Sequence, residues 1–318
     1  INTPAFALRR TIALTIIEII DVLDIRINEL NPGHLAELYK ILLESLDGRI
    51  YDGKEKLLDS LVNLACKSSS FLSKNDELYQ RVEERVVFEA NRKNKQYQKF
   101  SVLALGKLLS VYHEKDSLYD QYVNLVDQLL ESSVNDSDDS DDDGDITMRS
   151  DSTPIKKTSL VQVNLTQAII LNLIQSLSNG NSINEKILRY TFDTTITFLK
   201  STSVDLLPTS DAKFKLKQGI LSILTRLVEL NKPGLINNDW YNDKVIEVWE
   251  IVGSLTSTTD NLQPILVGFA RVSGLILNQL QIKDDYTSLI IRELKILSSE
   301  NVSPVVTIEC DKILSKFK

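Results

Sequence analysis

Residues 48–55 of the chain, Gly-Arg-Ile-Tyr-Asp-Gly-Lys-Glu, come within one residue of a phosphate-binding loop. In such a loop, backbone amides and a lysine hold the phosphates, and a serine or threonine after the lysine ligates Mg²⁺. Here Glu55 follows Lys54, and a carboxylate at that position would repel a triphosphate. A helical pattern, rather than a buried strand, also precedes Gly48. We therefore interpret the segment as a tight turn between helices, with Gly53 in the first turn of the second helix, and expect no cofactor.

An aspartate-rich segment imitates the start of a calcium loop. From Asp139 onward, carboxylates fill positions 1, 3 and 5, a glycine fills position 6, and an apolar residue fills position 8. The twelfth residue, which should be a bidentate glutamate, is Ser150, so loose cation association by a polyanion is the better interpretation. Ser133 and Ser140 each have an aspartate three residues later, which suits acidophilic kinases. Both are candidate phosphorylation sites.

Residues with catalytic potential are few. The two histidines, His34 and His113, lie near expected helix ends, and neither Cys66 nor Cys310 sits in a nucleophile motif. Metal ligands at diagnostic spacing are missing, so we expect no metal site and no enzymatic activity. Two cysteines far apart in the sequence are typical of a reducing, intracellular compartment.

Arg92, Lys93, Lys95 and Lys99 form a basic run across the end of one expected helix and the start of the next. Cations at a helix C-terminus complement the helix dipole, which is the structural interpretation. The functional alternative is a contact with an acidic protein surface. A specific nucleic-acid partner ranks below both, because the run lacks interleaved aromatic residues and the chain carries a net charge of −8.

Apolar residues recur at helical spacing along nearly the whole chain, while glycine and proline are scarce. Pro32 suits the first turn of a helix, and Gly48 suits a helix end. Asp52 and Glu55 resemble a capping box that would start the next helix at Asp52. The pattern predicts helices at about 5–27, 32–46, 52–65, 76–91, 95–113, 118–133, 159–178, 183–201, 211–231, 241–257, 262–279, 284–299 and 303–317.

Alternate expected helices begin roughly 42–52 residues apart, at or just above the step of HEAT or armadillo repeats. Each such unit is a helix pair that buries its apolar face only by stacking on its neighbours. The spacing predicts an all-α fold, an α-solenoid of HEAT/armadillo-like antiparallel helix pairs. A globular helical bundle is the alternative.

The charge is concentrated in one low-complexity segment. Residues 134–158 hold eight aspartates and three basic residues, or −5, which leaves −3 for the rest of the chain. Dense like charge opposes burial, so we expect an acidic disordered insert at 134–158. HEAT-like repeats are expected at 1–133 and again at 159–318.

Two further expectations concern the ends of the chain and the membrane. The most apolar stretch, residues 11–20, contains Glu18 and is too short to span a bilayer, so no membrane insertion is expected. The chain opens at Ile1 without a methionine, which favours a fragment of something longer.

Residues 48–58 resemble the Gly-Arg-x-Trp-x-Gly-Lys-Glu-x-Leu-Leu stretch near the C-terminal end of the large proteasome adaptor and scaffold family (Ecm-twenty-nine). Tyr51 stands where that family more often has tryptophan. Residues 94–99, Asn-Lys-Gln-Tyr-Gln-Lys, are similar to the family's Asn-x-Lys-Tyr-Lys segment. The acidic insert follows one helix pair later, where the family also carries a charged insertion. The motif residues in this chain are Gly48, Arg49, Tyr51, Gly53, Lys54 and Glu55.

The resemblance implies HEAT repeats from a longer solenoid, without catalytic residues. It also implies binding to the proteasome core and regulatory particles, tethering of the two, links to other cellular components, and a cytoplasmic and nuclear location. A nuclear-transport-type cargo receptor is an alternative, but it would show acidic inner helices or Asn/Trp ladders, and Trp240 and Trp249 are the only tryptophans. An assembly subunit of another large complex is a third.

Overall fold

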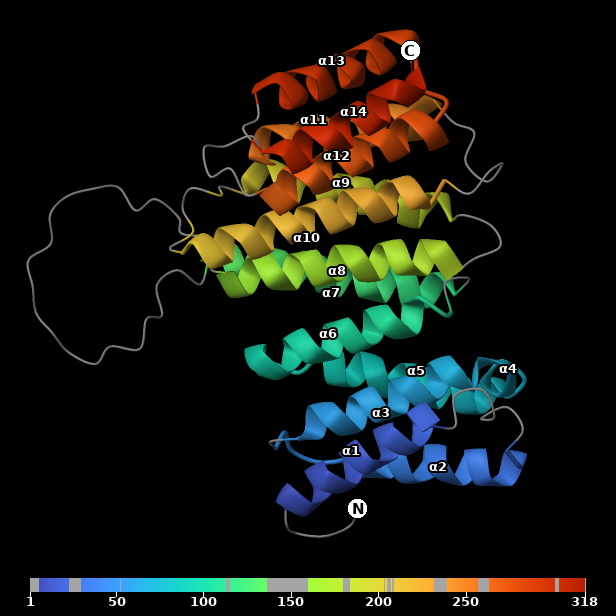
Figure 1. The fold of residues 1–318 in the computed structure, drawn as a ribbon. Helices are drawn as coiled ribbons and strands as arrows, with labels where there is room; N and C mark the ends of the chain where they lie inside the picture. The colour runs from blue at the N-terminus through green and yellow to red at the C-terminus, as the bar shows by residue number, and fades with distance from the viewer. Residues whose placement is uncertain are drawn as a thin grey trace, which may run out of the picture. The chain divides into compact units, whose positions relative to one another are not determined.

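The computed structural model describes residues 6–22, 30–51, 53–112, 115–135, 160–179, 184–202, 204, 207, 209–231, 239–256, 263–300 and 303–317. Within these ranges the secondary structure is helical, without a strand. The helices are α1 (Phe6–Val22), α2 (Pro32–Ser45), α3 (Lys54–Lys67), α4 (Ser69–Leu72), α5 (Asp76–Ala90), α6 (Lys95–Leu109), α7 (Asp116–Asn135), α8 (Leu160–Asn179), α9 (Glu185–Ser201), α10 (Ser210–Glu229), α11 (Asp239–Thr256), α12 (Gln263–Gln279), α13 (Asp284–Glu300), α14 (Pro304–Leu314) and the 3₁₀ turn η3 (Ser315–Phe317) (Figure 1).

Asparagine caps several helices at their N-termini. The side-chain oxygen of Asn94 accepts a hydrogen bond from the Tyr97 amide at 2.9 Å, and Asn75 accepts one from Leu78 at 3.2 Å. Asn31 caps α2, in which proline occupies the first turn as predicted. Each cap satisfies an amide that has no partner inside the helix, so the start of the helix is fixed locally.

The start of α3 differs from the prediction. The helix begins at Lys54 rather than at Asp52, which lies outside the described residues. Gly53 is the N-cap rather than a first-turn residue, with φ at 97°, a left-handed conformation that a glycine adopts without strain. Glu55 still caps backward, because its Oε2 accepts a hydrogen bond from the Gly53 amide at 3.0 Å.

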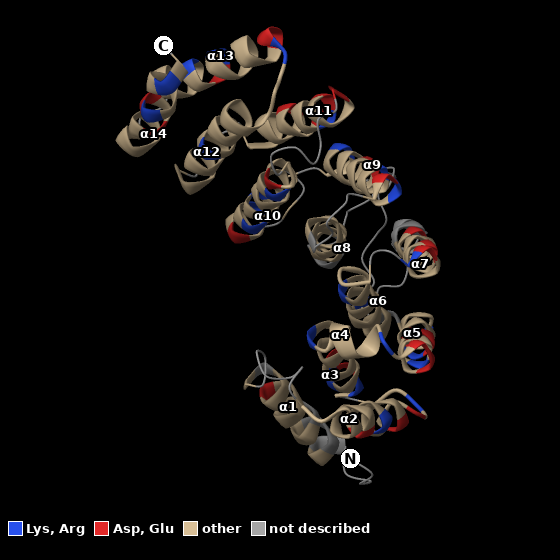
Figure 2. Ribbon diagram, turned by 90° about the vertical axis from the view of Figure 1, so that its right-hand side faces the viewer, with Lys and Arg blue, Asp and Glu red and all other residues tan. Residues whose placement is uncertain are grey.

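The chain divides into two compact units, unit 1 (Ile1–Leu129) and unit 2 (Leu130–Lys318). In unit 1, α1, α3 and α6 form one layer, with α3 in contact with both neighbours, and α2 and α5 pack against that layer (Figure 2). Helix α3 is covered on several sides, and nine of its 14 residues are buried. The small helix α4, which periodicity did not predict, lies in the connection from α3 to α5 and contacts both.

Unit 2 repeats the same two-layer arrangement. Helices α8, α10, α12 and α14 contact one another in sequence as one layer, and α9, α11 and α13 pack on them as the second (Figure 2). Trp249 of α11 joins the layers, because its Nε1 donates to Ser273 Oγ at 2.8 Å and its ring stacks on Phe269. Each unit is thus a stack of antiparallel helix pairs, the α-solenoid predicted from the sequence.

Polar contacts between helices recur at a sequence separation of about one repeat. Three of them join residues 47, 49 and 47 positions apart: Tyr112 Oη to the Ala65 carbonyl at 3.0 Å, Gln167 Nε2 to the Leu216 carbonyl at 3.2 Å, and Lys200 Nζ to Glu247 Oε1 at 2.9 Å. Contacts of this separation are expected when each helix pair meets only its neighbours. No helix among the described residues is long and apolar enough to cross a membrane.

Candidate functional site

The turn between α2 and α3 contains the motif that resembled a phosphate loop. Gly48 and Gly53 flank it, both with φ in the left-handed region, at 86° and 97°. These two conformations reverse the chain within a few residues and bring Lys54, the first residue of α3, back toward Gly48. The Lys54 Nζ donates to the Gly48 carbonyl at 3.3 Å, which closes the turn from inside.

Lys54 is fully buried and forms an ion pair with Glu89 of α5. Its Nζ lies 3.1 Å from Glu89 Oε1, and both side chains are 0% exposed. Burial lowers the pKa of Lys54, and the Glu89 carboxylate opposes that shift. A buried ammonium is tolerated because this carboxylate and the Gly48 carbonyl replace the water that it lost.

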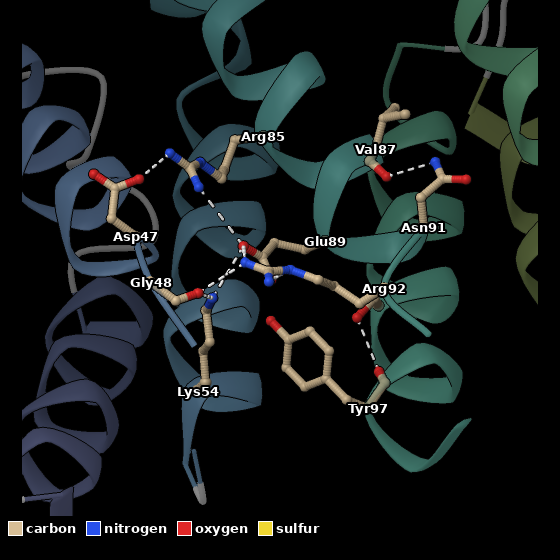
Figure 3. A network of polar contacts seen from close by, with 10 residues as sticks. Asp47, Gly48, Lys54, Arg85, Val87, Glu89, Asn91, Arg92 and Tyr97 are labelled. Atoms are coloured by element: carbon tan, nitrogen blue, oxygen red, sulfur yellow. Dashed lines mark hydrogen bonds and ion pairs between the residues drawn. The ribbon is translucent and has the colours of Figure 1, made fainter. Parts of the chain in front are cut away.

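Two arginines from α5 and its C-terminal end complete the network around Glu89, as Figure 3 shows. Arg92 Nε lies 3.4 Å from Glu89 Oε2, and Arg92 Nη2 donates to the Gly48 carbonyl at 2.9 Å. Arg85 Nη1 lies 3.7 Å from Glu89 Oε1, and the same guanidinium forms an ion pair with Asp47. The network therefore fastens the turn after α2 to the end of α5.

The Tyr97 side chain of α6 lies beside the network. Its hydroxyl is buried near Glu89, and burial, followed by the charge of Glu89, raises its pKa. The hydroxyl therefore stays protonated and presents a dipole rather than a second negative charge to the carboxylate. Residues from the α2–α3 turn, α5 and α6 thus converge on one carboxylate.

The network joins neighbouring helix pairs to each other. The Lys54 ammonium has no exposed surface, and its contacts are with Gly48 and Glu89. The lysine of the phosphate-loop-like motif therefore points into the protein, with the acid that pairs with it supplied by the next helix pair. The arrangement can hold a turn and two helices in register, since removing one partner would leave a buried charge uncompensated.

The remaining sequence-predicted residues lie in different places. Arg49 is exposed and Tyr51 is half-buried in the turn. In the basic run, the structure brings Arg92 into the network, leaves Lys93 exposed and half-buries Lys99, while Lys95 is the first residue of α6. Ser133 belongs to α7, whereas Ser140, the calcium-loop-like segment and nearly all of the acidic insert lie outside the described residues.

Sequence reasoning missed Glu89, and a signal for it was present. Helix α5 buries Val82, Val86 and Ala90 on one apolar stripe, and Glu89 lies on that stripe. A carboxylate at a stripe position requires cations, and Arg85 and Arg92 stand four residues before and three after it, which places them on the same helix face. The roles of Asp47 and Lys54 could not be predicted in this way, because they depend on which repeats are in contact.

The other titratable candidates are dispersed. His34 is exposed, and His113 lies outside the described residues. Cys66 is half-buried and Cys310 buried, both as free thiols. In the described part of the chain, no three histidine, cysteine, aspartate or glutamate side chains gather as metal ligands would.

The helix pairs are stacked, and polar contacts join residues about one repeat apart. These features define a helical repeat protein of the armadillo-like class. The family described as ECM29, C-terminal ARM-like repeats, matches residues 65–267, more than half of the chain, and the chain belongs to this family. The match begins after the turn at Gly48–Lys54 and includes Glu89 and both arginines of the network.

Among curated proteins, the chain is similar to the proteasome component ECM29 of Saccharomyces cerevisiae. The identity is 24% over 250 residues, which cover 78% of this chain and 12% of that protein. Among solved structures, it is similar to two crystal structures of engineered proteins, with TM-scores of 0.46 and 0.43 and identities of 17% and 13%. Each match covers 88% of this chain, and they cover 98% and 95% of the engineered chains.

Proposed function

We propose that this chain is a non-catalytic, proteasome-associated scaffold that helps to tether the core and regulatory particles and to link them to other components. The observation that carries the proposal is membership of the ECM29 C-terminal repeat family, matched over residues 65–267. The yeast relative is named a proteasome component, which supports the same partner. A cytoplasmic and nuclear location is part of this proposal.

The chemistry of the site supports a scaffold. The buried Lys54 and Glu89 pair with each other, and Lys54 also donates to the Gly48 carbonyl, in an arrangement that holds repeats together. Regularly stacked helix pairs present long surfaces, and one such surface can engage more than one partner at once. Simultaneous engagement raises the effective concentration of each partner for the other, which is a geometric route to tethering.

The test is direct binding with purified components. The affinity-tagged chain is incubated with purified core particle, purified regulatory particle, or both, and the bound fraction is measured on native gels and by affinity capture. An engineered helical repeat protein of similar length is the control, because it has the same kind of surface without the family's sequence. Saturable capture of either particle above the control supports the proposal, and capture equal to the control contradicts it.

A further inference from the structure

Phe88 of α5 is an exposed aromatic residue set between two fixed cations. Its side chain is 52% exposed, and the Arg92 guanidinium lies 4.6 Å from the ring centroid, with that of Arg85 at 5.7 Å. Single exposed hydrophobic residues are common on protein surfaces. A ring within cation–π distance of two guanidinium groups is a different feature, because aromatic and arginine side chains are the types enriched where proteins bind one another.

The buried network fixes both guanidinium groups beside the ring. Glu89 binds Arg92 and Arg85, the Gly48 carbonyl holds Arg92, and Arg85 also pairs with Asp47. The two arginine side chains are 24% and 23% exposed, so each keeps an accessible edge. Side chains that are already ordered lose little entropy when a partner binds, which favours affinity at this position.

The charge around Phe88 is opposite to that of the chain. The network holds three cations against two carboxylates. Arg81 of α5, Arg49 of the turn and Lys93 after α5 are also exposed, close in sequence to the network, and Glu84 is an exposed carboxylate of α5. The arginines at the ring and these exposed cations contrast with the net charge of −8 of the whole chain. We call Phe88 with Arg49, Arg81, Arg85, Arg92 and Lys93 the Phe88 surface.

We propose that the Phe88 surface binds an acidic protein segment that places an apolar side chain on the Phe88 ring. The positive charge selects carboxylates, and the exposed ring supplies an apolar anchor point between them. Nucleic acid fits less well, because single-stranded nucleic acid is bound on platforms of several aromatic rings, whereas the Phe88 surface offers one. The inference concerns the chemistry of the contact and does not depend on a proteasome particle being the partner.

The test uses a fluorescent peptide with a central leucine flanked by glutamates. Comparison peptides carry glutamine or lysine in place of glutamate, or alanine in place of leucine, and an oligouridylate of equal length probes nucleic acid. The glutamate–leucine peptide should bind the full chain at least about tenfold more tightly than each comparison ligand, and its affinity should fall as salt rises. Binding no tighter than that of the glutamine peptide, or tighter binding of the oligouridylate, overturns the proposal.

Matched variants locate the contact. Phe88→Ala and Lys93→Glu should each weaken binding of the glutamate–leucine peptide by about tenfold or more. Phe100→Ala, which removes a ring that is 50% exposed on α6, and Lys40→Glu, which reverses an exposed charge on α2, should leave it unchanged. Lys93→Glu does not alter the described network, so it tests the surface even if Phe88→Ala unfolds. Equal loss in surface and control variants contradicts the proposal.

Discussion

A fully buried carboxylate is stable only where cations and hydrogen-bond donors surround it. Glu89 is such a group, with Lys54 at 3.1 Å and Arg92 at 3.4 Å. Each charge in the network is stabilised by the others, so removing any one of them should destabilise the fold. An isolated surface ion pair has no such dependence, since water takes over when one partner is lost.

We expect Glu89→Gln to lower the free energy of unfolding by about 3–5 kcal/mol, because it leaves the Lys54 ammonium buried without a counter-charge. Lys54→Met should also be destabilising, because it removes a cation that compensates the buried Glu89 carboxylate. The double variant should lose less free energy of unfolding than the two single variants added together. Urea unfolding measures all three. Glu185→Gln is the control, since its ion pair with Arg189 is exposed and should contribute about 0.5 kcal/mol or less. Equal losses at Glu89 and Glu185 would refute the buried network.

The free thiols give a dependence on pH. Burial raises the pKa of Cys66 and of Cys310 from near 9 to about 11. Between pH 9 and 11 the folded chain binds more protons than the unfolded chain. The stabilisation contributed by the neutral thiols is therefore fully present below about pH 9 and is lost as the pH rises through about 11. Melting temperatures measured across this window should fall, and Cys66→Ala should reduce the fall. A melting temperature that rises with pH in that window would contradict the assignment.

At the scale of elements, helix positions could be predicted because their causes are local. Apolar spacing locates α9 to α13 closely, and Pro32 locates the start of α2. The four-residue α4 is too short to show a period. The start of α3 was misplaced because two local signals compete, a capping-box pattern at Asp52 and the left-handed glycine at Gly53, and the glycine decides where the helix begins.

The site could be predicted only in part, because its contacts are not local. Arg92 and the carbonyl of Gly48 are 44 residues apart, and Lys54 pairs with Glu89, which lies 35 residues further along the chain. A charged residue on an apolar stripe signals that a buried partner exists. It does not name the partner, which depends on which helices the repeat places together.

Substitutions at Gly48 test the conformation of the turn between α2 and α3. Its φ is 86°, and a side chain there would meet no atom within 4 Å, so the effect of a substitution is backbone strain alone. Gly48→Ala should lower the free energy of unfolding by about 1–2 kcal/mol, and Gly48→Asn by less, because asparagine tolerates the left-handed region better. Thermal unfolding of both variants checks the order. Alanine tolerated as well as asparagine would mean that the turn can relax.

At the scale of the whole molecule, we expect each helix pair to be stabilised mainly by the pairs next to it. In each unit the helices contact those of the adjoining pair, so a local loss should spread mainly to the next pair. A protein of this kind can tolerate strain at one place while keeping distant surfaces intact. That property suits the scaffold function proposed above, in which separate contact surfaces must each remain formed.

This distribution predicts where a defect is felt. In Glu89→Gln, amide hydrogen exchange should rise in α3, α5 and α6, which contact one another, and stay unchanged in α12 and α14. Trp249→Phe in unit 2 breaks the hydrogen bond to Ser273 and should show the reverse pattern, with faster exchange in α11 and α12 and no change in α3. Hydrogen exchange with mass spectrometry resolves these helices separately. If either variant accelerated exchange equally along the chain, the two units would unfold as one cooperative block, and stability would depend on the whole stack rather than on neighbouring pairs.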